Sequence, residues 1–101
     1  MFVYNITSKV EHTILTDWLQ WQKEIHIPAI LDTGCFYEHR FYELLEHRED
    51  DGRTFVLQFL ATSKSDYNRY IEIYAPSLRK KSIVKWKEQV FSFTTLMVNV
   101  E

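Results

Sequence analysis

Glycine, proline and cysteine are all scarce in this chain of 101 residues. Glycine and proline are typical residues of turns and loops, and the chain has only two of each. We therefore expect short connections between its helices and strands. The single cysteine, Cys35, excludes an internal disulfide and is typical of a protein from a reducing compartment. We therefore expect Cys35 to be a small buried apolar side chain and the protein to be cytoplasmic.

Neither sign of charge dominates the sequence. Twelve basic against fourteen acidic residues give a net charge of −2, which argues against a nucleic-acid binder, because such proteins usually carry a strong basic excess. No apolar run is long enough to cross a bilayer, and residues 1–6 lack the basic start of a signal peptide. We expect neither a nucleic-acid nor a membrane partner.

The usual motifs for metals and phosphate-bearing cofactors are also missing. There is no glycine-rich phosphate loop, and the histidines, at positions 12, 26, 39 and 47, are too widely spaced to form a ligand cluster. The sequence therefore predicts no metal site and no cofactor. Aromatic residues, in contrast, make up 16% of the chain, and the hydrophobic share of 46% suits a single globular domain over residues 1–101.

In the first half of the chain, the spacing of the apolar residues changes from that of a strand to that of a helix. Residues 2–7 alternate as a strand does, with Phe2, Tyr4 and Ile6 on one face. Residues 8–11 resemble a helix-capping box, and residues 15–29 repeat at helical spacing, with Ile25 on the apolar face. Pro28 should interrupt or kink that helix.

The second half repeats this order. Residues 35–46 and 54–62 read as two strands joined by a turn at Asp51-Gly52. Ser63 and Asp66 predict the cap of a second helix, which Pro76 breaks before it restarts, and residues 90–100 form the last strand. The fold class is therefore α+β: a ferredoxin-like βαββαβ sandwich, whose four-stranded antiparallel sheet carries two kinked helices on one face.

The last predicted strand is apolar on both faces, and the third is partly so. Helices on one side of a sheet cover only one face, so a second apolar face needs another cover. A second copy of the sheet is the simplest one, and we predict a homodimer. The alternative is that these strands tolerate exposed Val and Leu side chains.

His26 is the first candidate for a functional residue. It follows Gln22 by four residues and Trp18 by eight, so the three should share one edge of the helix. An imidazole in that place is suited to act as a general base or as an axial ligand. The simpler interpretation is structural: His26 caps backbone carbonyl groups that lose their helical hydrogen bonds at the Pro28 kink.

Four further residues are candidates for a ligand pocket. Asn5 is an amide in an otherwise apolar strand, and a buried amide needs hydrogen-bond partners. It either orients an oxygen of a bound ligand, or bonds to neighbouring backbone or lies near the dimer interface. Trp18, Trp21 and Tyr74 are suited to line an aromatic pocket, although aromatics at helical spacing are more often core. The basic run at residues 79–87 reads first as a solvated face and second as a weak anion site.

Several segments together resemble an uncharacterised bacterial family of about 100 residues, filed as a domain of unknown function. They are Trp18-Leu19-Gln20-Trp21, His26-Ile27-Pro28, Leu31–Phe36, Tyr74–Arg79 and Phe91–Thr95. The resemblance spans nearly the whole chain and implies a ferredoxin-like fold, with no established activity.

The layout is more remotely similar to the dimeric α/β-barrel superfamily, which includes haem-degrading and cofactor-free monooxygenases as well as binding proteins. Some haem-degrading members use an Asn in the first strand with a Trp and a His on a later helix, and Asn5 matches the first of these. The second predicted helix carries Tyr67, Tyr70 and Tyr74 but no histidine, which departs from that pattern.

Three functions follow as hypotheses. The first is a dimeric domain that binds a small molecule or a protein without catalysis. The second is a monooxygenase or isomerase, with Asn5 and His26 as polar groups of one cavity and Trp21 and Tyr74 as its walls. The third is a regulatory module that senses a metabolite at the dimer interface.

Overall fold

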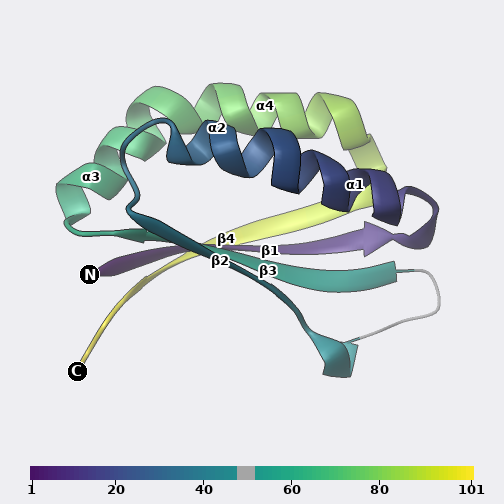
Figure 1. Cartoon of the computed structure of the whole chain (residues 1–101), viewed down its shortest axis with the longest axis horizontal. Helices are drawn as coiled ribbons and strands as arrows, with labels where there is room; N and C mark the ends of the chain where they lie inside the picture. Colours follow the sequence, from purple (N-terminus) through teal and green to yellow (C-terminus); the bar gives the residue numbers. More distant parts are fainter. Residues whose placement is uncertain (48–51) are drawn as a thin grey trace.

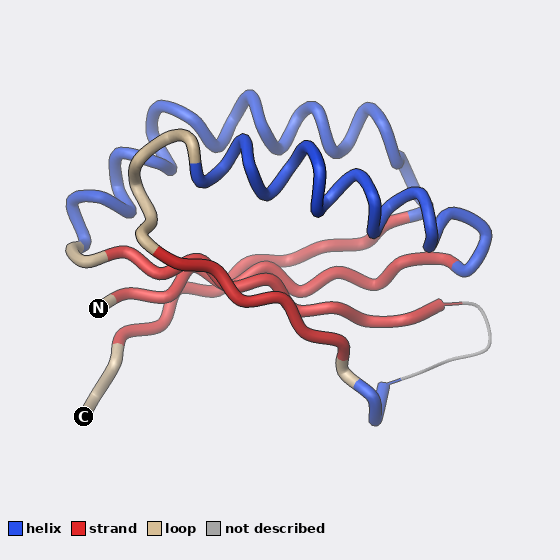
Figure 2. The backbone as a smooth tube through the Cα atoms, in the orientation of Figure 1, coloured by secondary structure: helices blue, strands red, loops and turns tan. Residues whose placement is uncertain are grey.

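A computed structural model of the chain describes residues 1–47 and 52–101. Its sheet consists of the strands β1 (Phe2–Glu11), β2 (Glu38–Glu43), β3 (Gly52–Ala61) and β4 (Val90–Val98). They lie in the order β2-β3-β1-β4, and every neighbouring pair is antiparallel. The helices cover one face of this sheet and leave the other open, and the two termini lie at the same end of the molecule (Figures 1 and 2). The predicted ferredoxin-like fold is confirmed.

The layer of helices consists of two runs, each made of several segments. The first run consists of η1 (His12–Ile14), α1 (Leu15–Trp21), η2 (Gln22–His26) and α2 (Ile27–Leu31). The second consists of α3 (Lys64–Arg69), η4 (Tyr70–Tyr74), α4 (Ala75–Trp86) and η5 (Lys87–Gln89), and a short turn, η3 (Leu45–His47), follows β2. Among these, η2 and η4 are π-helical, and η1, η3 and η5 are 3₁₀ turns.

A proline follows each π-helical segment, at the start of α2 and of α4. Proline has no N–H and crowds the carbonyl one turn earlier, so the ordinary α-helical bond is lost there, and a wider turn accommodates the ring. Each proline therefore widens the turn before it without ending its run. The expected break at Pro76 is wrong, because the run continues from η4 into α4. The extra residue also rotates the buried face. Ile25, predicted to be buried, is 57% exposed, whereas Gln22 and His26 are buried.

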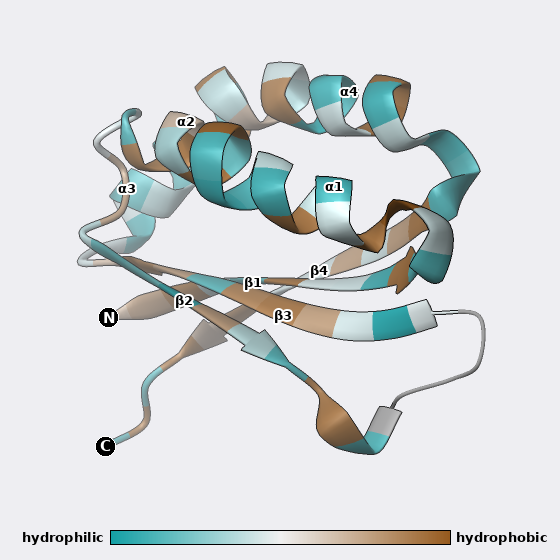
Figure 3. Cartoon of the chain, turned by 45° about the vertical axis from the view of Figure 1, so that its right-hand side comes forward, coloured by the Kyte–Doolittle hydropathy of each residue, from teal (hydrophilic) through white to brown (hydrophobic). Residues whose placement is uncertain are grey.

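The register of the sheet defines its two faces. Tyr4 stands opposite Phe59 and Leu96, and Ser8 stands opposite Phe55 and Ser92, so these side chains share the face beneath the helices. The alternation predicted for residues 2–7 is confirmed. Figure 3 shows the apolar stretches of β1 and β3 running under the helical layer.

Some predicted ends differ from the structure. Residues 8–11 do not cap a helix, because β1 continues through Glu11 to pair with β3. The Ser63 cap is confirmed, since its hydroxyl accepts a bond from the Asp66 amide at 3.2 Å. The second strand is shorter than residues 35–46, and Asp51 of the predicted turn lies outside the described residues.

The core beneath the helices is split into two clusters. One gathers around Tyr4, Phe59 and Tyr70, and the other is built from Val10, Trp18, Trp21, Phe55 and Trp86. Cys35 is buried in the first cluster, as predicted. Within the described residues, no helix has the length and apolarity needed to span a membrane.

Candidate functional site

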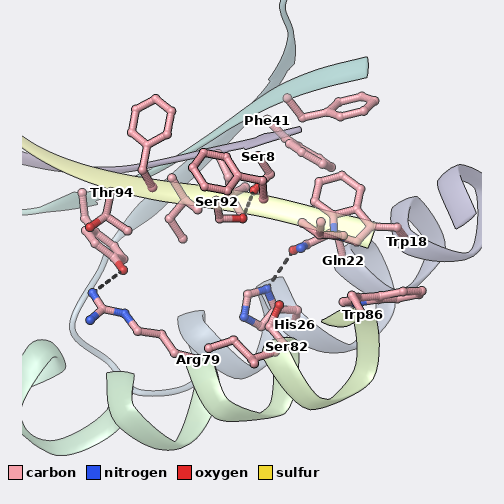
Figure 4. Close-up of a pocket in the computed structure, with 18 of the residues that line it drawn as sticks. Ser8, Trp18, Gln22, His26, Phe41, Arg79, Ser82, Trp86, Ser92 and Thr94 are labelled. Atoms are coloured by element: carbon pink, nitrogen blue, oxygen red, sulfur yellow. Dashed lines mark hydrogen bonds between the residues drawn. The ribbon is translucent and has the colours of Figure 1, made fainter. Parts of the chain in front are cut away.

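A cavity of about 450 Å³ opens between the sheet and the helices. Its walls include Tyr4 and Tyr70 from the first core cluster and Trp18, Phe55 and Trp86 from the second, so it lies where the two clusters meet. This volume suits a small organic ligand, and a lining in which aromatic and aliphatic residues outnumber the polar ones is typical of ligand sites. Figure 4 shows the polar side chains arranged around this space.

His26 and Gln22 form the first polar pair. Both are buried, and His26 Nδ1 lies 2.9 Å from Gln22 Oε1 (Figure 4). A carbonyl oxygen only accepts hydrogen bonds, so Nδ1 donates and Nε2 keeps a free lone pair. Burial lowers the pKa of His26 to about 4, which makes the ring neutral at pH 7. The pair therefore presents a hydrogen-bond acceptor at the cavity.

The π-helical segment η2 is what brings this pair to the cavity. His26 is its last residue and Gln22 its first, and the wider turn directs both toward the sheet. Trp21 stacks flat on the imidazole, with ring centroids 4.6 Å apart and planes inclined by 13°. The ring is thus fixed by a hydrogen bond and a stacking contact.

Tyr4 and Arg79 form the second polar pair. Arg79 Nη2 donates to Tyr4 Oη at 2.9 Å, and its guanidinium lies 5.9 Å from the centre of the Tyr4 ring. Burial raises the pKa of Tyr4, and burial with the nearby Tyr4 raises the pKa of Tyr70. Both phenols are therefore neutral at pH 7, and Arg79 keeps its positive charge uncompensated by them.

Two serines and Thr94 add polar groups on the sheet side. Ser8 Oγ and Ser92 Oγ lie 2.7 Å apart on the neighbouring strands β1 and β4. A hydroxyl both donates and accepts, so this pair can rearrange to suit either kind of ligand atom.

The indoles of Trp18 and Trp86 belong to the aromatic wall. Both side chains are buried, and neither Nε1 has a hydrogen-bond acceptor. A buried donor without a partner costs about 1–3 kcal/mol. Among the described residues, these two N–H groups are the buried side-chain polar atoms without a partner, and the two tryptophans that carry them line the cavity.

Some of the predicted site residues line the cavity and others lie outside it. His26 and Trp18 line the cavity. Trp21 packs behind His26 and the Trp86 ring instead of forming a wall. Tyr74 borders a smaller hollow on the outer side of the helices, with Ala29 and Leu78, and packs against the first core cluster.

Asn5 lies on the other face of the sheet. Its amide donates to Thr7 Oγ1 and Thr95 Oγ1, at 3.1 and 3.4 Å, and its oxygen accepts from Gln58. The prediction of one cavity that reaches both Asn5 and His26 is therefore wrong. Alternation along β1 explains this, because Asn5 falls between Tyr4 and Ile6, which face the helices.

Three cavity groups were missed by reasoning from the sequence. Arg79 was read as part of a solvated basic run, although it is the one cation of that run bonded to a buried phenol. Ser8 was read as a helix cap, and Ser92 carried no signal of its own. Only the pairing of β1 with β4 brings the two hydroxyls together.

Lys87 at the cavity rim has an unusual backbone, with φ at 53° and ψ at −129°. This conformation is favourable only for glycine, because a Cβ crowds the following peptide. We expect Lys87→Gly to raise the free energy of unfolding by about 1 kcal/mol, measured by chemical denaturation. Lys85→Gly, in the α-helical part of the same run, should lower it by a similar amount.

A four-stranded antiparallel sheet with two helical runs on one face defines the ferredoxin-like class of folds. Solved structures of this class resemble the chain over its whole length. A dimeric ferredoxin-like protein from an uncultured marine organism has a TM-score of 0.73 at 14% identity, covering 100% of this chain and 96% of that one. An antibiotic biosynthesis monooxygenase from Nitrosomonas europaea, described as putative, has a TM-score of 0.68 at 14% identity and covers 100% of both chains.

A third similar structure is SnoaB, a cofactor-independent oxygenase from Streptomyces nogalater. Its TM-score is 0.63 at 11% identity, over 99% of this chain and 94% of that one. Identities this low establish the fold and leave activity open. Among curated proteins, none matches the sequence.

The chain belongs to the family described as domain of unknown function DUF4286, whose model matches residues 1–100. The family resemblance drawn from the Trp18, His26 and Tyr74 segments is thereby confirmed.

Proposed function

We propose that this protein is a cytoplasmic homodimer that binds a small organic molecule in the cavity between its sheet and helices, without catalysing a reaction on it. The cavity is the observation that supports this proposal. It has the volume of a ligand site, an aromatic lining, and polar pairs that approach it from both layers. A core that only needed stability would be expected to fill such a space, because voids lose packing energy.

The open face of the sheet supports the homodimer. β4 is an edge strand, and its alternate residues Phe91, Phe93 and Met97 are 69%, 54% and 42% exposed on that face. Apolar patches of this kind are uncommon on monomers. A similar structure is itself described as a dimeric ferredoxin-like protein. The buried network around Asn5 lies at the centre of the same face and would set the register of two copies.

The protonation of His26 favours binding over catalysis. A general base works best when its pKa is close to the operating pH. With a pKa of about 4, His26 is a weak base and a good neutral hydrogen-bond acceptor. A monooxygenase or isomerase remains the second candidate, since two similar structures are named as monooxygenase and oxygenase. A general-base role for His26 in such a reaction would require ligand binding to raise its pKa.

The test fills the cavity from α4. Ser82 lines it, whereas Ser77 on the same helix does not. We expect the neutral fluorescent probe N-phenyl-1-naphthylamine to bind the native protein, and Ser82→Phe to weaken that binding by about tenfold or more, since a tenfold change corresponds to about 1.4 kcal/mol. Titration is followed by the rise in probe fluorescence.

Ser77→Phe is the matched control and should bind the probe as the unmodified chain does. Equal affinity in the unmodified chain and in Ser82→Phe would show that the cavity is not the binding site and would refute the proposed function. Circular dichroism on both variants confirms that each is folded.

A further inference from the structure

The charges around the cavity are of one sign. Its lining includes two cations, Arg79 and Lys87, and no Asp or Glu from the described residues. His26 and Tyr70, the other titratable groups on the helix side, are both neutral at pH 7. The cavity is therefore electropositive in a chain whose net charge is −2. A site lined by one sign of charge concentrates ligands of the opposite sign.

Arg79 has unused donors. A guanidinium carries five N–H groups, and within the described part of the chain Arg79 donates one bond, to Tyr4 Oη, and forms no ion pair with a carboxylate. The bond to a buried phenol holds the guanidinium at the cavity wall. A fixed guanidinium with free donors matches the planar, two-oxygen geometry of an organic acid group.

The aromatic wall lies at the opposite end. Figure 4 shows Arg79 at one end of the cavity and the indoles of Trp18 and Trp86 at the other, with His26 between them. A flat apolar ring is expected to pack against these indoles, because aromatic surfaces bury large areas and prefer stacked or edge contacts. A cavity with a cationic end and an aromatic end favours a ligand that has an anionic group at one end and an aromatic ring at the other.

We infer that the cavity takes an aromatic organic anion, with its acid group on the Arg79 guanidinium and its rings against Trp18 and Trp86. This inference rests on the proposed function and adds the class of ligand to it. The neutral His26 is suited to accept a hydrogen bond from a hydroxyl or amine of the ligand between these two ends.

The test compares two probes with the same ring skeleton. 8-Anilino-1-naphthalenesulfonate is N-phenyl-1-naphthylamine with an added sulfonate group, so the pair differs by the anion alone. We expect the unmodified chain to bind the sulfonate more tightly, and Arg79→Gln to weaken sulfonate binding by about tenfold, as for the loss of a charge-assisted hydrogen bond. Binding of the neutral probe should change by less than about twofold.

Two further variants serve as controls. Arg79→Lys keeps the charge without the planar fork and should bind the sulfonate with intermediate affinity. Lys81→Gln removes an exposed cation from the same helix, outside the cavity, and should leave both affinities unchanged.

The outcomes separate the two proposals. A preference for the sulfonate that disappears in Arg79→Gln and is blocked by Ser82→Phe supports both. Equal loss of the two probes in Arg79→Gln, or no preference for the sulfonate in the unmodified chain, overturns the anion inference while the cavity remains a binding site. Probe binding that Ser82→Phe does not affect refutes both, because the probes then bind elsewhere.

Discussion

Phe93→Lys is expected to convert the protein from a dimer into a monomer. Phe93 lies on the open face of β4, opposite Thr7 of β1, and its side chain is 54% exposed in the single chain. In a dimer with twofold symmetry one patch meets its own copy, so a single substitution introduces two cations into the interface. Burying an unpaired ammonium costs several kcal/mol, more than a modest interface can absorb.

Light scattering at micromolar concentration measures the result directly. The unmodified protein should have the mass of two 12.2-kDa chains, and Phe93→Lys the mass of one. Ile73→Lys is the matched control, because Ile73 is 62% exposed but lies on the helical side of the molecule. Monomeric mass in the unmodified protein, or dimeric mass in Phe93→Lys, would show that this face is not the interface.

The fold could be predicted from the sequence because the order of its strand-like and helix-like segments is clear and its first strand alternates. In β1, the residues Phe2, Tyr4 and Ile6 fall on one face, and the register with β3 and β4 confirms this. Such alternation depends on neighbours two residues apart, which the sequence displays directly. The Ser63 cap is equally local, since its hydroxyl and the Asp66 amide are three residues apart.

The rotation of the helices could not be predicted in the same way. A disturbance of the helix was expected at Pro28 and a break at Pro76, but the expected buried face followed an ordinary α-helical period. The π-helical segments add a residue to one turn, which exposes Ile25 and buries His26. A proline indicates that a distortion occurs, and only the packed structure shows which kind.

The candidate site was predictable only in part. His26, Trp18 and Gln22 were recognised as one group because they lie on a single helix. Arg79 with Tyr4, and Ser8 with Ser92, meet across 75 and 84 residues of sequence, so their pairing depends on tertiary structure. The failure of Asn5 as a partner of His26 has a local cause, because strand alternation places Asn5 on the face opposite to Tyr4 and Ile6.

His26→Gln is expected to remove a large part of the acid sensitivity of the fold. Burial lowers the pKa of His26 to about 4, whereas an unperturbed histidine titrates at 6.5. Between these two values the unfolded chain takes up a proton that the folded chain does not, so acid favours unfolding. The contribution of neutral His26 is complete above about pH 6.5 and is lost as the pH falls toward 4, by about 3 kcal/mol in total.

The measurement is the free energy of unfolding from urea titrations at pH 7 and at pH 5. From the two pKa values, His26 alone should cost the unmodified chain about 2 kcal/mol over this interval. His26→Gln has no proton to gain, so its own loss should be smaller by that amount, although its stability at pH 7 is lower because the Gln22 bond and the Trp21 stacking contact are altered.

The change in the free energy of unfolding between pH 7 and pH 5 isolates the titration of His26, because it does not depend on the packing that the substitution disturbs. Carboxylates titrate over the same interval in both chains and cancel in the comparison. His39→Gln provides the matched control for the loss of an exposed imidazole on β2. If His26→Gln and the unmodified chain lose equal stability between pH 7 and pH 5, His26 is charged inside the fold, and its place as a neutral acceptor in the cavity is wrong.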